Sequence, residues 1–449
     1  MEKQNEKIIL KNKALEEKEE EIGNLKKQLN EVMNLTSSAL EQVKTPIQVL
    51  TNTISSLIED DSISKMPNIQ NKLRQLMVFV SKQNLYKPTV ENFISNKNID
   101  NVTKSYIFSE ISGRNLDVND ELELSSLTFP NLSNHSIDPR FESWTFDLFN
   151  LSSQEILIHL KQFFVHFDLI NRFKIDEKQF EKFLLLVKKN YFENPYHNFI
   201  HAFDVTQTIF SMLISMNLVQ YLTHVDIFAL LISGLCHDLQ HPGLNNPHQV
   251  TTMSELAIKY NDKSVLENHH CYMTFKLLLD NQILENTPKS EFLELRKIII
   301  ACILATDMAA HFEFLSKIES RTQSGKQWNR DDRDDRILLS QLIMKVSDIS
   351  NVAKSWDCSY KWTEFLSKEF FNQGDLEKSK NLDVAPFMDR EKSSMFKNTC
   401  NFIDFVASPF FTNVSKSLPS TNQIVDLLKE NRVKWGELQT EFENQQKTN

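Results

Sequence analysis

The stretch Cys236-His237-Asp238-Leu239-Gln240-His241-Pro242-Gly243 decides how this chain is interpreted. It contains a His-Asp pair and a second histidine four positions after the first, and it ends in a Pro-Gly step that stops a helix. Neutral imidazole and carboxylate are ligands that divalent metal ions accept. A carboxylate can also bridge two ions because it has two oxygens. The stretch therefore predicts a metal site at the end of a helix.

Two other clusters carry the same kinds of side chain. Upstream, His197 and His201 are spaced to share one face of a helix. Downstream, Asp348 ends a mostly apolar run. A single histidine on an apolar face is more often an ordinary core or surface residue. Three clusters in one region are harder to explain in that way, and together they would complete a two-metal hydrolytic site.

A longer series of short strings extends this pattern along the chain. They are Tyr196-His197-Asn198, His201-Ala202, Asp204-Val205, His237-Asp238, His241-Pro242-Gly243, Ser254-Glu255-Leu256-Ala257, Tyr260-Asn261-Asp262, 265–270, Ala305-Thr306-Asp307-Met308, 347–351, Glu369-Phe370-Phe371, Gln373-Gly374-Asp375 and Phe402-Ile403-Asp404. In this order and spacing, the region from about Phe141 to about Glu437 resembles the catalytic domain of class I cyclic-nucleotide phosphodiesterases, which are HD-type metal phosphohydrolases. The form of a few flanking strings is nearest to the high-affinity, cAMP-specific, IBMX-insensitive branch.

The resemblance implies a role for each matching residue. The first ion, expected to be zinc, would be held by His201, His237, Asp238 and Asp348. Asp238 would bridge to a second, mostly water-bound ion, which suits magnesium or manganese. A hydroxide activated by both ions would attack the cyclic phosphate, and His197 would protonate the leaving O3′. Five residues match positions that orient ligands and waters, although ordinary helix-end roles also fit them: His241, Glu267, His270, Thr306 and Asp307.

The expected nucleotide pocket departs from the family at one position. The resemblance assigns five residues to it: Tyr196, Asn351, Leu366, Thr399 and Phe402. Phe402 would stack on the purine, with Leu366 as the opposing wall, although core packing also explains such apolar residues. The family carries a base-binding Gln three residues before the stacking Phe, and this chain has Thr399 there. Thr has a shorter reach and no paired donor and acceptor, so we expect base binding to weaken by about 1–3 kcal/mol.

The resemblance therefore predicts an enzyme that hydrolyses a 3′,5′-cyclic nucleotide to the 5′-monophosphate in signalling, with cAMP favoured and cGMP possible. An alternative from another class is an anchored structural or scaffold protein built on a catalytically weakened phosphodiesterase fold. Thr399 and the N-terminal sequence motivate this alternative. A phosphohydrolase of linear nucleotides is a further alternative, which the long match through residues 254–270 disfavours.

Composition predicts an all-α fold and excludes several classes of protein. The 449 residues include only 7 Gly, which favours helices over hairpin-rich sheets. A net charge of −10 without a basic stripe does not indicate a nucleic-acid partner. We expect no transmembrane segment and no secretory signal. The five scattered cysteines suit a reducing compartment. Helix-type apolar spacing occurs over 155–170, 176–190, 202–219, 224–236, 252–260, 264–281, 289–306, 308–320, 334–347, 360–373 and 392–407.

The N-terminal sequence predicts a coiled coil. Ile8, Leu15, Ile22 and Leu29 recur every seven residues, which indicates homodimerisation or anchoring. The alternative is a solvated single helix, since lysines interrupt the seam. We expect a cytoplasmic protein that could associate with the cytoskeleton or a membrane through a partner. The predicted domains are a coiled-coil helix (1–44), a helical segment and linker (45–140), the catalytic domain (141–440) and a tail (441–449).

Overall fold

The computed structural model describes residues 137–448, Phe129 and seven positions nearer the start of the chain (54, 56–58, 69, 72 and 73). The chain divides into two units, Met1–Asp117 and Val118–Asn449. The seven described positions of the first unit are helical. The predicted coiled coil over 1–44 lies outside the described residues and stays a prediction. All candidate site residues lie in the second unit.

The second unit is built from helices, and its described residues contain no β-strand. This confirms the predicted all-α class. The α-helices are α8 (Ser153–His166), α9 (Leu169–Arg172), α10 (Glu177–Lys189), α11 (Phe199–Ser215), α12 (His224–Cys236), α13 (Asn246–Thr251), α14 (Glu255–Tyr260), α15 (Val265–Asp280), α16 (Lys289–Leu304), α17 (His311–Gln323), α18 (Arg333–Asp348), α19 (Trp356–Ser379), α20 (Met395–Phe402), α21 (Ser408–Ser417) and α22 (Asn422–Thr448). Between or beside them, in the described part of this unit, lie six short 3-10 helices and one π-helix, η7: η2 (Pro139–Glu142), η3 (Leu218–Tyr221), η4 (Met308–Ala310), η5 (Ser350–Ala353), η6 (Pro386–Met388), η7 (Ile403–Ala407) and η8 (Pro419–Thr421).

The centre of this unit is formed by α11, α12, α16 and α18. Helix α12 packs on the other three, and nearly all of its side chains are buried. Gly234 allows the close approach to α11, because an added Cβ there would lie 3.3 Å from the Cα of Thr206. Since α11, α12 and α18 pack together, the candidate ligands at their ends are brought to one place.

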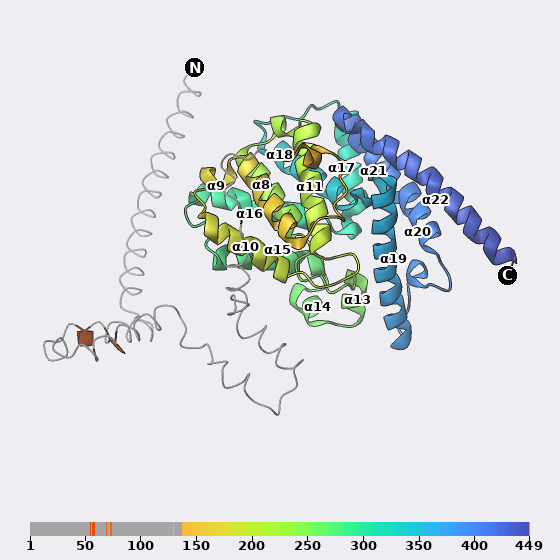
Figure 1. Cartoon of the computed structure of the whole chain (residues 1–449), viewed down its shortest axis with the longest axis horizontal. Coiled ribbons are helices and arrows are strands. Elements are labelled where there is room, and N and C mark those ends of the chain that lie inside the picture. Colours follow the sequence, from red (N-terminus) through yellow and green to blue (C-terminus); the bar gives the residue numbers. More distant parts are fainter. Residues whose placement is uncertain are drawn as a thin grey trace, which may run out of the picture. The chain divides into compact units, whose positions relative to one another are not determined.

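The C-terminal helices close the other side of the domain. Helix α22 packs across α20, α21 and η5 (Figure 1). Its Trp435 is fully buried, and the Trp435 and Tyr360 rings stack with centroids 5.4 Å apart. The Asn431 side-chain amide donates to the backbone oxygens of Val352 and Lys354 at 3.0 and 2.9 Å. Helix α22 therefore fixes η5, which carries Asn351.

Several predicted helices differ from the observed ones at their ends. The segment expected over 202–219 begins at Phe199, because the Asn198 side chain accepts from two backbone N–H groups and caps α11. The segment expected over 252–260 contains only α14, which begins at Glu255 because the Ser254 side chain caps it, and the preceding helix α13 was not predicted. The last expected segment, 392–407, continues through the π-helical η7 into α21. Pro409, a residue type that usually ends a helix, lies in the first turn of α21. Because Pro409 has no N–H to continue the α-helical ladder, a local π turn is a natural accommodation.

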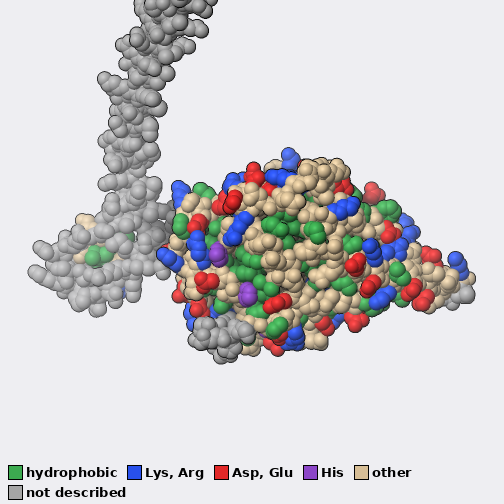
Figure 2. Space-filling model, turned by 90° about the horizontal axis from the view of Figure 1, so that it is seen from above, with side chains coloured by type: hydrophobic (Ala, Val, Ile, Leu, Met, Phe, Trp, Pro, Cys, Tyr) green, Lys and Arg blue, Asp and Glu red, His purple; other side chains and the backbone are tan. Residues whose placement is uncertain are grey.

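The face in Figure 2 carries acidic and basic side chains interspersed among hydrophobic patches. No single helix among the described residues is both long and apolar enough to span a membrane. The pair Lys289–Leu304 and Met308–Gln323 meets that criterion only jointly, with an 82° bend between its members.

Gly374 on α19 offers a test of the packing. An added Cβ there would lie 2.1 Å from the backbone oxygen of Met388. We expect Gly374→Ala to destabilise the fold by about 1–3 kcal/mol, because a backbone group cannot move away cheaply. Urea unfolding of the full chain would measure this effect.

Gly436→Ala is the matched control, because its added Cβ meets only the mobile end of Arg432. Alanine there should be neutral or stabilising by up to about 1 kcal/mol through helix propensity. Equal unfolding midpoints for Gly374→Ala and the wild type would contradict the close approach of Met388 to α19.

Candidate metal centre and active site

Two helix termini present the first pair of candidate ligands. His201 lies in the first turn of α11, where the Asn198 cap fixes the backbone. His237 directly follows α12, and its Nδ1 lies 2.9 Å from the backbone oxygen of Gly234. We assign the Nδ1–H tautomer from this contact, which leaves the Nε2 lone pair free to ligate. Both imidazoles are almost completely buried.

Four ligand atoms converge at this point. The Nε2 atoms of His201 and His237 are 3.3 Å apart. Asp348 Oδ1, from the last residue of α18, lies 3.4 Å from the first and 3.2 Å from the second. Asp238 Oδ2 lies 3.6 and 3.1 Å from the same two atoms. Ligands at about 2.0–2.2 Å from one ion stand roughly 3.0–3.5 Å from each other, so these separations fit a single metal ion.

The chemistry of the set also fits a metal. Asp238 Oδ2 is buried and has no hydrogen-bond partner among the described residues. Burial alone would raise the pKa of Asp348, yet the neighbouring imidazoles of His201 and His237 hold its pKa below the ordinary value. The two carboxylates therefore stabilise positive charge at this place. A divalent ion supplies that charge and leaves both imidazoles neutral.

The second oxygen of Asp238 faces a different neighbour. Asp238 Oδ1 lies 3.7 Å from Nε2 of His270, whose Nδ1 is 2.7 Å from the backbone oxygen of Leu239. His241 stacks against His270 at 5.8 Å, and its Nδ1 accepts from the Gly243 N–H at 3.0 Å. Burial, reinforced by the positive charge of His197, holds the pKa of His241 well below its ordinary value, so this imidazole is neutral. The structure thus places His241 and His270 beside the centre.

The other three residues expected around the metals differ in what they contact. Glu267 accepts from the Asn246 side chain at 2.9 and 3.2 Å, and burial together with nearby Asp307 raises its pKa to about 7. Asp307 accepts from Ser264 Oγ at 2.7 Å and caps η4. The Thr306 hydroxyl donates to the backbone oxygen of Ile303 at 2.7 Å, an ordinary helix-end bond.

His197, the expected general acid, is paired with a carboxylate. Its Nδ1 forms a very short hydrogen bond with Glu369 Oε1. The other oxygen of Glu369 accepts from the backbone N–H groups of Tyr196 and His197 at 2.9 and 3.1 Å. Burial lowers the pKa of His197, but the charge of Glu369 outweighs it and raises the pKa to about 9. His197 is therefore protonated at neutral pH.

Glu369 is a functional residue to which the sequence alone assigned no role. It begins a polar series on one face of α19, spaced by four residues. Gln373 bonds to Asn245 at 2.8 Å, and Glu377 Oε1 lies 2.9 Å from His248 Nδ1. This spacing on an otherwise apolar face is the signal that could have identified the series. His197, Asn245 and His248 are all held by α19 in this way.

A buried ion pair, also missed from the sequence, connects α11 to η5. Lys354 Nζ lies 3.3 Å from Asp204 Oδ1 and donates to Thr208 Oγ1 at 2.6 Å. Lys354 is only 1% exposed. Because Asp204 is one turn after His201, and Lys354 follows Asn351, the pair fixes Asn351 relative to the metal ligands.

The residues expected to bind nucleotide lie on elements that pack around α19. Leu366 and Phe370 on α19 and Phe402 on α20 are partly exposed. Asn351 and Thr399 are each 6% exposed. The Thr399 hydroxyl donates to the backbone oxygen of Met395 at 2.7 Å, so its donor is engaged within α20. Tyr196 packs against His201 and Trp362, at 4.6 and 5.3 Å between ring centroids, and lies behind the metal ligands.

Comparison with known proteins yields relatives of one kind. A model of the 3′5′-cyclic nucleotide phosphodiesterase family matches residues 196–428. The chain is 38% identical over 428 residues to the 3′,5′-cyclic-nucleotide phosphodiesterase regA of Dictyostelium discoideum, covering 94% of this chain and 53% of regA. It is 36% identical over 297 residues to the human high affinity cGMP-specific 3′,5′-cyclic phosphodiesterase 9A, covering 66% of this chain and 50% of that protein. The chain thus spans about half the length of these curated relatives.

A solved structure shows the same fold. The phosphodiesterase domain of the Salpingoeca rosetta rhodopsin phosphodiesterase superposes with a TM-score of 0.66 at 33% identity. The match covers 72% of this chain and 98% of that domain.

Metal content tests the four-ligand site directly. We expect Asp348→Ala to weaken metal binding by at least about tenfold, because one of the four ligands is lost. The other three ligands remain, so binding is weakened and not abolished. Inductively coupled plasma mass spectrometry of protein dialysed against a weak chelator would measure the metal retained per chain. Asp375→Ala, an exposed aspartate paired with Arg390, is the matched control and should keep its metal. Full retention by Asp348→Ala would contradict the assignment.

Proposed function

The chain belongs to the 3′5′-cyclic nucleotide phosphodiesterase family, and from this premise we propose that it hydrolyses a 3′,5′-cyclic nucleotide to the 5′-monophosphate. One observation carries the proposal: the convergence of His201, His237 and Asp348, with Asp238 beside both imidazoles, next to the His197–Glu369 pair. In the reaction, water adds to phosphorus, the P–O3′ bond breaks and O3′ gains a proton.

The metal ions would be held by the residues described above. Two imidazoles and two carboxylates suit zinc at the first position. Asp238 would also help to hold a second ion, and a position filled mainly by water and carboxylate oxygen would suit magnesium or manganese. When bound, such ions provide Lewis-acid neutralisation of the phosphate and lower the pKa of water.

The proton for the leaving group would come from His197. Glu369 holds the ring through Nδ1 and favours the protonated form. Nε2 has no partner among the described residues and is the nitrogen free to donate to O3′. His241, stacked on His197 with centroids 3.9 Å apart, limits rotation of the ring. Glu369 is therefore a positioning residue for the acid.

The base would enter the slot between Leu366 and Phe402. One polar side chain on η5, which packs against α19, is free: Asn351 is 6% exposed and has no hydrogen-bond partner among the described residues. We assign base recognition to Asn351, with little contribution from Thr399 because its donor is already engaged. The absent Gln corresponds to about 1–3 kcal/mol of base binding.

The choice between nucleotides rests on sequence resemblance, which favours cAMP over cGMP. One relative of the chain is named as a cGMP-specific enzyme. The side-chain amide of Asn351 carries both a donor and an acceptor, and because it is not held by a partner among the described residues it can turn to meet either purine edge. We therefore propose that cAMP is favoured by a modest margin only.

Side-by-side hydrolysis of cAMP and cGMP with added Mg²⁺ tests the proposal. We expect turnover of both nucleotides, faster with cAMP, and a loss of at least about 100-fold in Asp348→Ala because a metal ligand is missing. Asp375→Ala should retain wild-type rates. If folded, metal-loaded protein hydrolyses neither nucleotide, the proposed function is wrong and the scaffold alternative gains.

Glu369→Gln tests the acid pair. The charge of Glu369 raises the pKa of His197, so the acid is protonated below about pH 9 and is lost as the pH rises through that value. Removing the charge lowers this pKa. We expect the alkaline limb of the pH–rate profile to move to lower pH, with turnover at neutral pH reduced by about 10–100-fold.

Glu364→Gln on the same helix is exposed and serves as the control for this experiment. An unchanged alkaline limb in Glu369→Gln would show that Glu369 does not control the ionisation of His197.

A further inference from the structure

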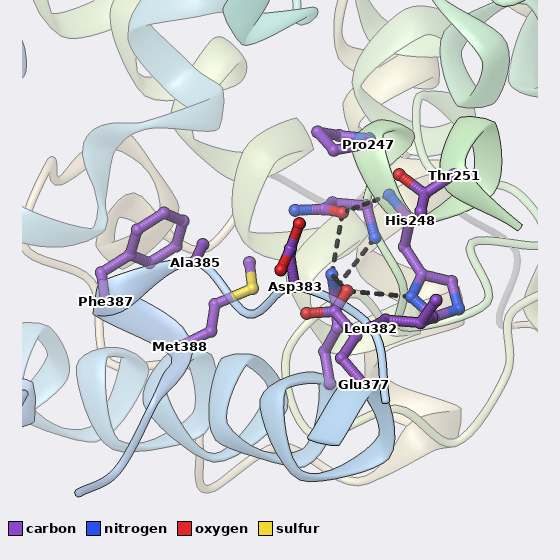
Figure 3. A pocket seen from close by; sticks show the side chains of 11 residues that line it. Pro247, His248, Thr251, Glu377, Leu382, Asp383, Ala385, Phe387 and Met388 are labelled. Atoms are coloured by element: carbon purple, nitrogen blue, oxygen red, sulfur yellow. Dashed lines mark hydrogen bonds and ion pairs between the residues drawn. The ribbon is translucent and has the colours of Figure 1, made fainter. Parts of the chain in front are cut away.

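A pocket separate from the metal ligands lies between α13, the second half of α19 and the segment 382–388 (Figure 3). It encloses about 480 Å³ of non-atom space, which includes its open mouth. None of the residues that line it was assigned to the metal centre or the nucleotide slot.

The segment that forms the outer wall is held firmly. Met388 lies against Gly374, where there is no space for a side chain. Asp389 accepts from Lys378 at 2.6 Å. This bond, together with Lys392, outweighs the effect of burial and lowers the pKa of Asp389 to about 2. The pocket is therefore part of the folded domain.

The inner wall carries a buried carboxylate with one free oxygen. Glu377 is 6% exposed. Its Oε1 accepts from Gln373 Nε2 at 2.8 Å and lies 2.9 Å from His248 Nδ1. Its Oε2 has no partner among the described residues, and Figure 3 shows the carboxylate facing the pocket. A carboxylate oxygen that opens into a pocket and has no protein partner among the described residues is placed to accept from a donor or to pair with a cation.

A second carboxylate faces the same space. Asp383 is exposed and forms no hydrogen bond or ion pair with any described residue. The nearby cations are engaged elsewhere: Lys378 with Asp389 and Glu391, and Arg390 with Asp375. Figure 3 shows the side chains of Asp383 and Glu377 directed toward one another. Two like charges in a partly enclosed space favour a cation between them.

The remaining walls indicate what kind of cation fits. Leu382, Ala385, Phe387 and Pro247 line the pocket with apolar surface. A hydrated metal ion gains nothing from such surface, whereas the methylenes of an alkyl chain do. Phe387 also offers an aromatic face to a cation. Among the described residues, the groups able to surround a metal do not include Glu377 or Asp383.

We propose that this pocket binds a primary alkylammonium group, with its N–H donors on Glu377 Oε2 and Asp383 and its alkyl chain on Leu382, Ala385 and Phe387. The group can belong to a free amine or to a lysine side chain, which present the same chemistry. Binding by the pocket does not depend on the proposed hydrolytic function.

Ligand-observed NMR titration of the full-length protein with n-pentylammonium, in 0.15 M NaCl, tests the proposal. We expect saturable binding with a dissociation constant on the order of millimolar, as suits six non-hydrogen atoms. n-Pentanol, which has the same shape but no charge, should bind at least tenfold more weakly. Titration with Nα-acetyl-lysine N-methylamide distinguishes the sources, because tighter binding than that of pentylammonium indicates a lysine side chain.

Asp383→Asn is the decisive variant, because Asp383 makes no contact whose loss could unfold the protein. It should weaken pentylammonium binding at least tenfold, as should Glu377→Gln. Glu364→Gln, an exposed α19 variant outside the pocket, should bind like the wild type. No saturable binding, equal binding of pentanol, or wild-type affinity in Asp383→Asn would each overturn the proposal.

Discussion

The site depends on one electrostatic constraint: two carboxylates and two imidazoles present acceptor atoms to one another in a buried space. Asp238 and Asp348 cannot share this space with the lone pairs of His201 and His237 unless positive charge lies between them. The constraint explains why the ends of three helices meet here. The first turn of α11, the residues after α12 and the last residue of α18 each deliver ligands, and the buried packing of these helices fixes the positions of those ligands.

Helix α19 organises the second part of the site. Glu369, Gln373 and Glu377 each bond to a residue on another part of the chain. Their partners are His197, which is the proposed acid, the loop residue Asn245 and the α13 residue His248, so all three are attached to one helix. The proposed ammonium pocket lies at the far end of the same series. Phe387 of that pocket contacts Phe370 edge to face, with centroids 5.5 Å apart. The pocket and the proposed nucleotide slot therefore lie along the same helix.

The sequence was sufficient where the signal is local. The His-Asp stretch, the helical spacing of residues 264–281 and the order of the family strings led to the all-α fold and to a ligand set that the structure brings together. It was insufficient where a residue acts through a partner distant in sequence. Glu369 binds a histidine 172 residues away, and Lys354 binds Thr208 across 146 residues. Helices α21 and α22 were also not predicted, and in α21 a proline, Pro409, lies in the first turn directly after the π turn.

Thr399 shows how a missing side chain can leave the chemistry intact while changing selectivity. The metal ligands and His197 act on the phosphate and O3′, which are the same in every purine cyclic nucleotide, so hydrolysis does not require a residue that reads the base. Selectivity arises only from a difference in binding between two bases. An amide held in one orientation creates such a difference because it offers a fixed donor and acceptor. A side-chain amide that no described residue holds, such as that of Asn351, can turn to offer either, so it satisfies both purines and rejects neither strongly. The substitution at Thr399 therefore lowers discrimination more than it lowers catalysis.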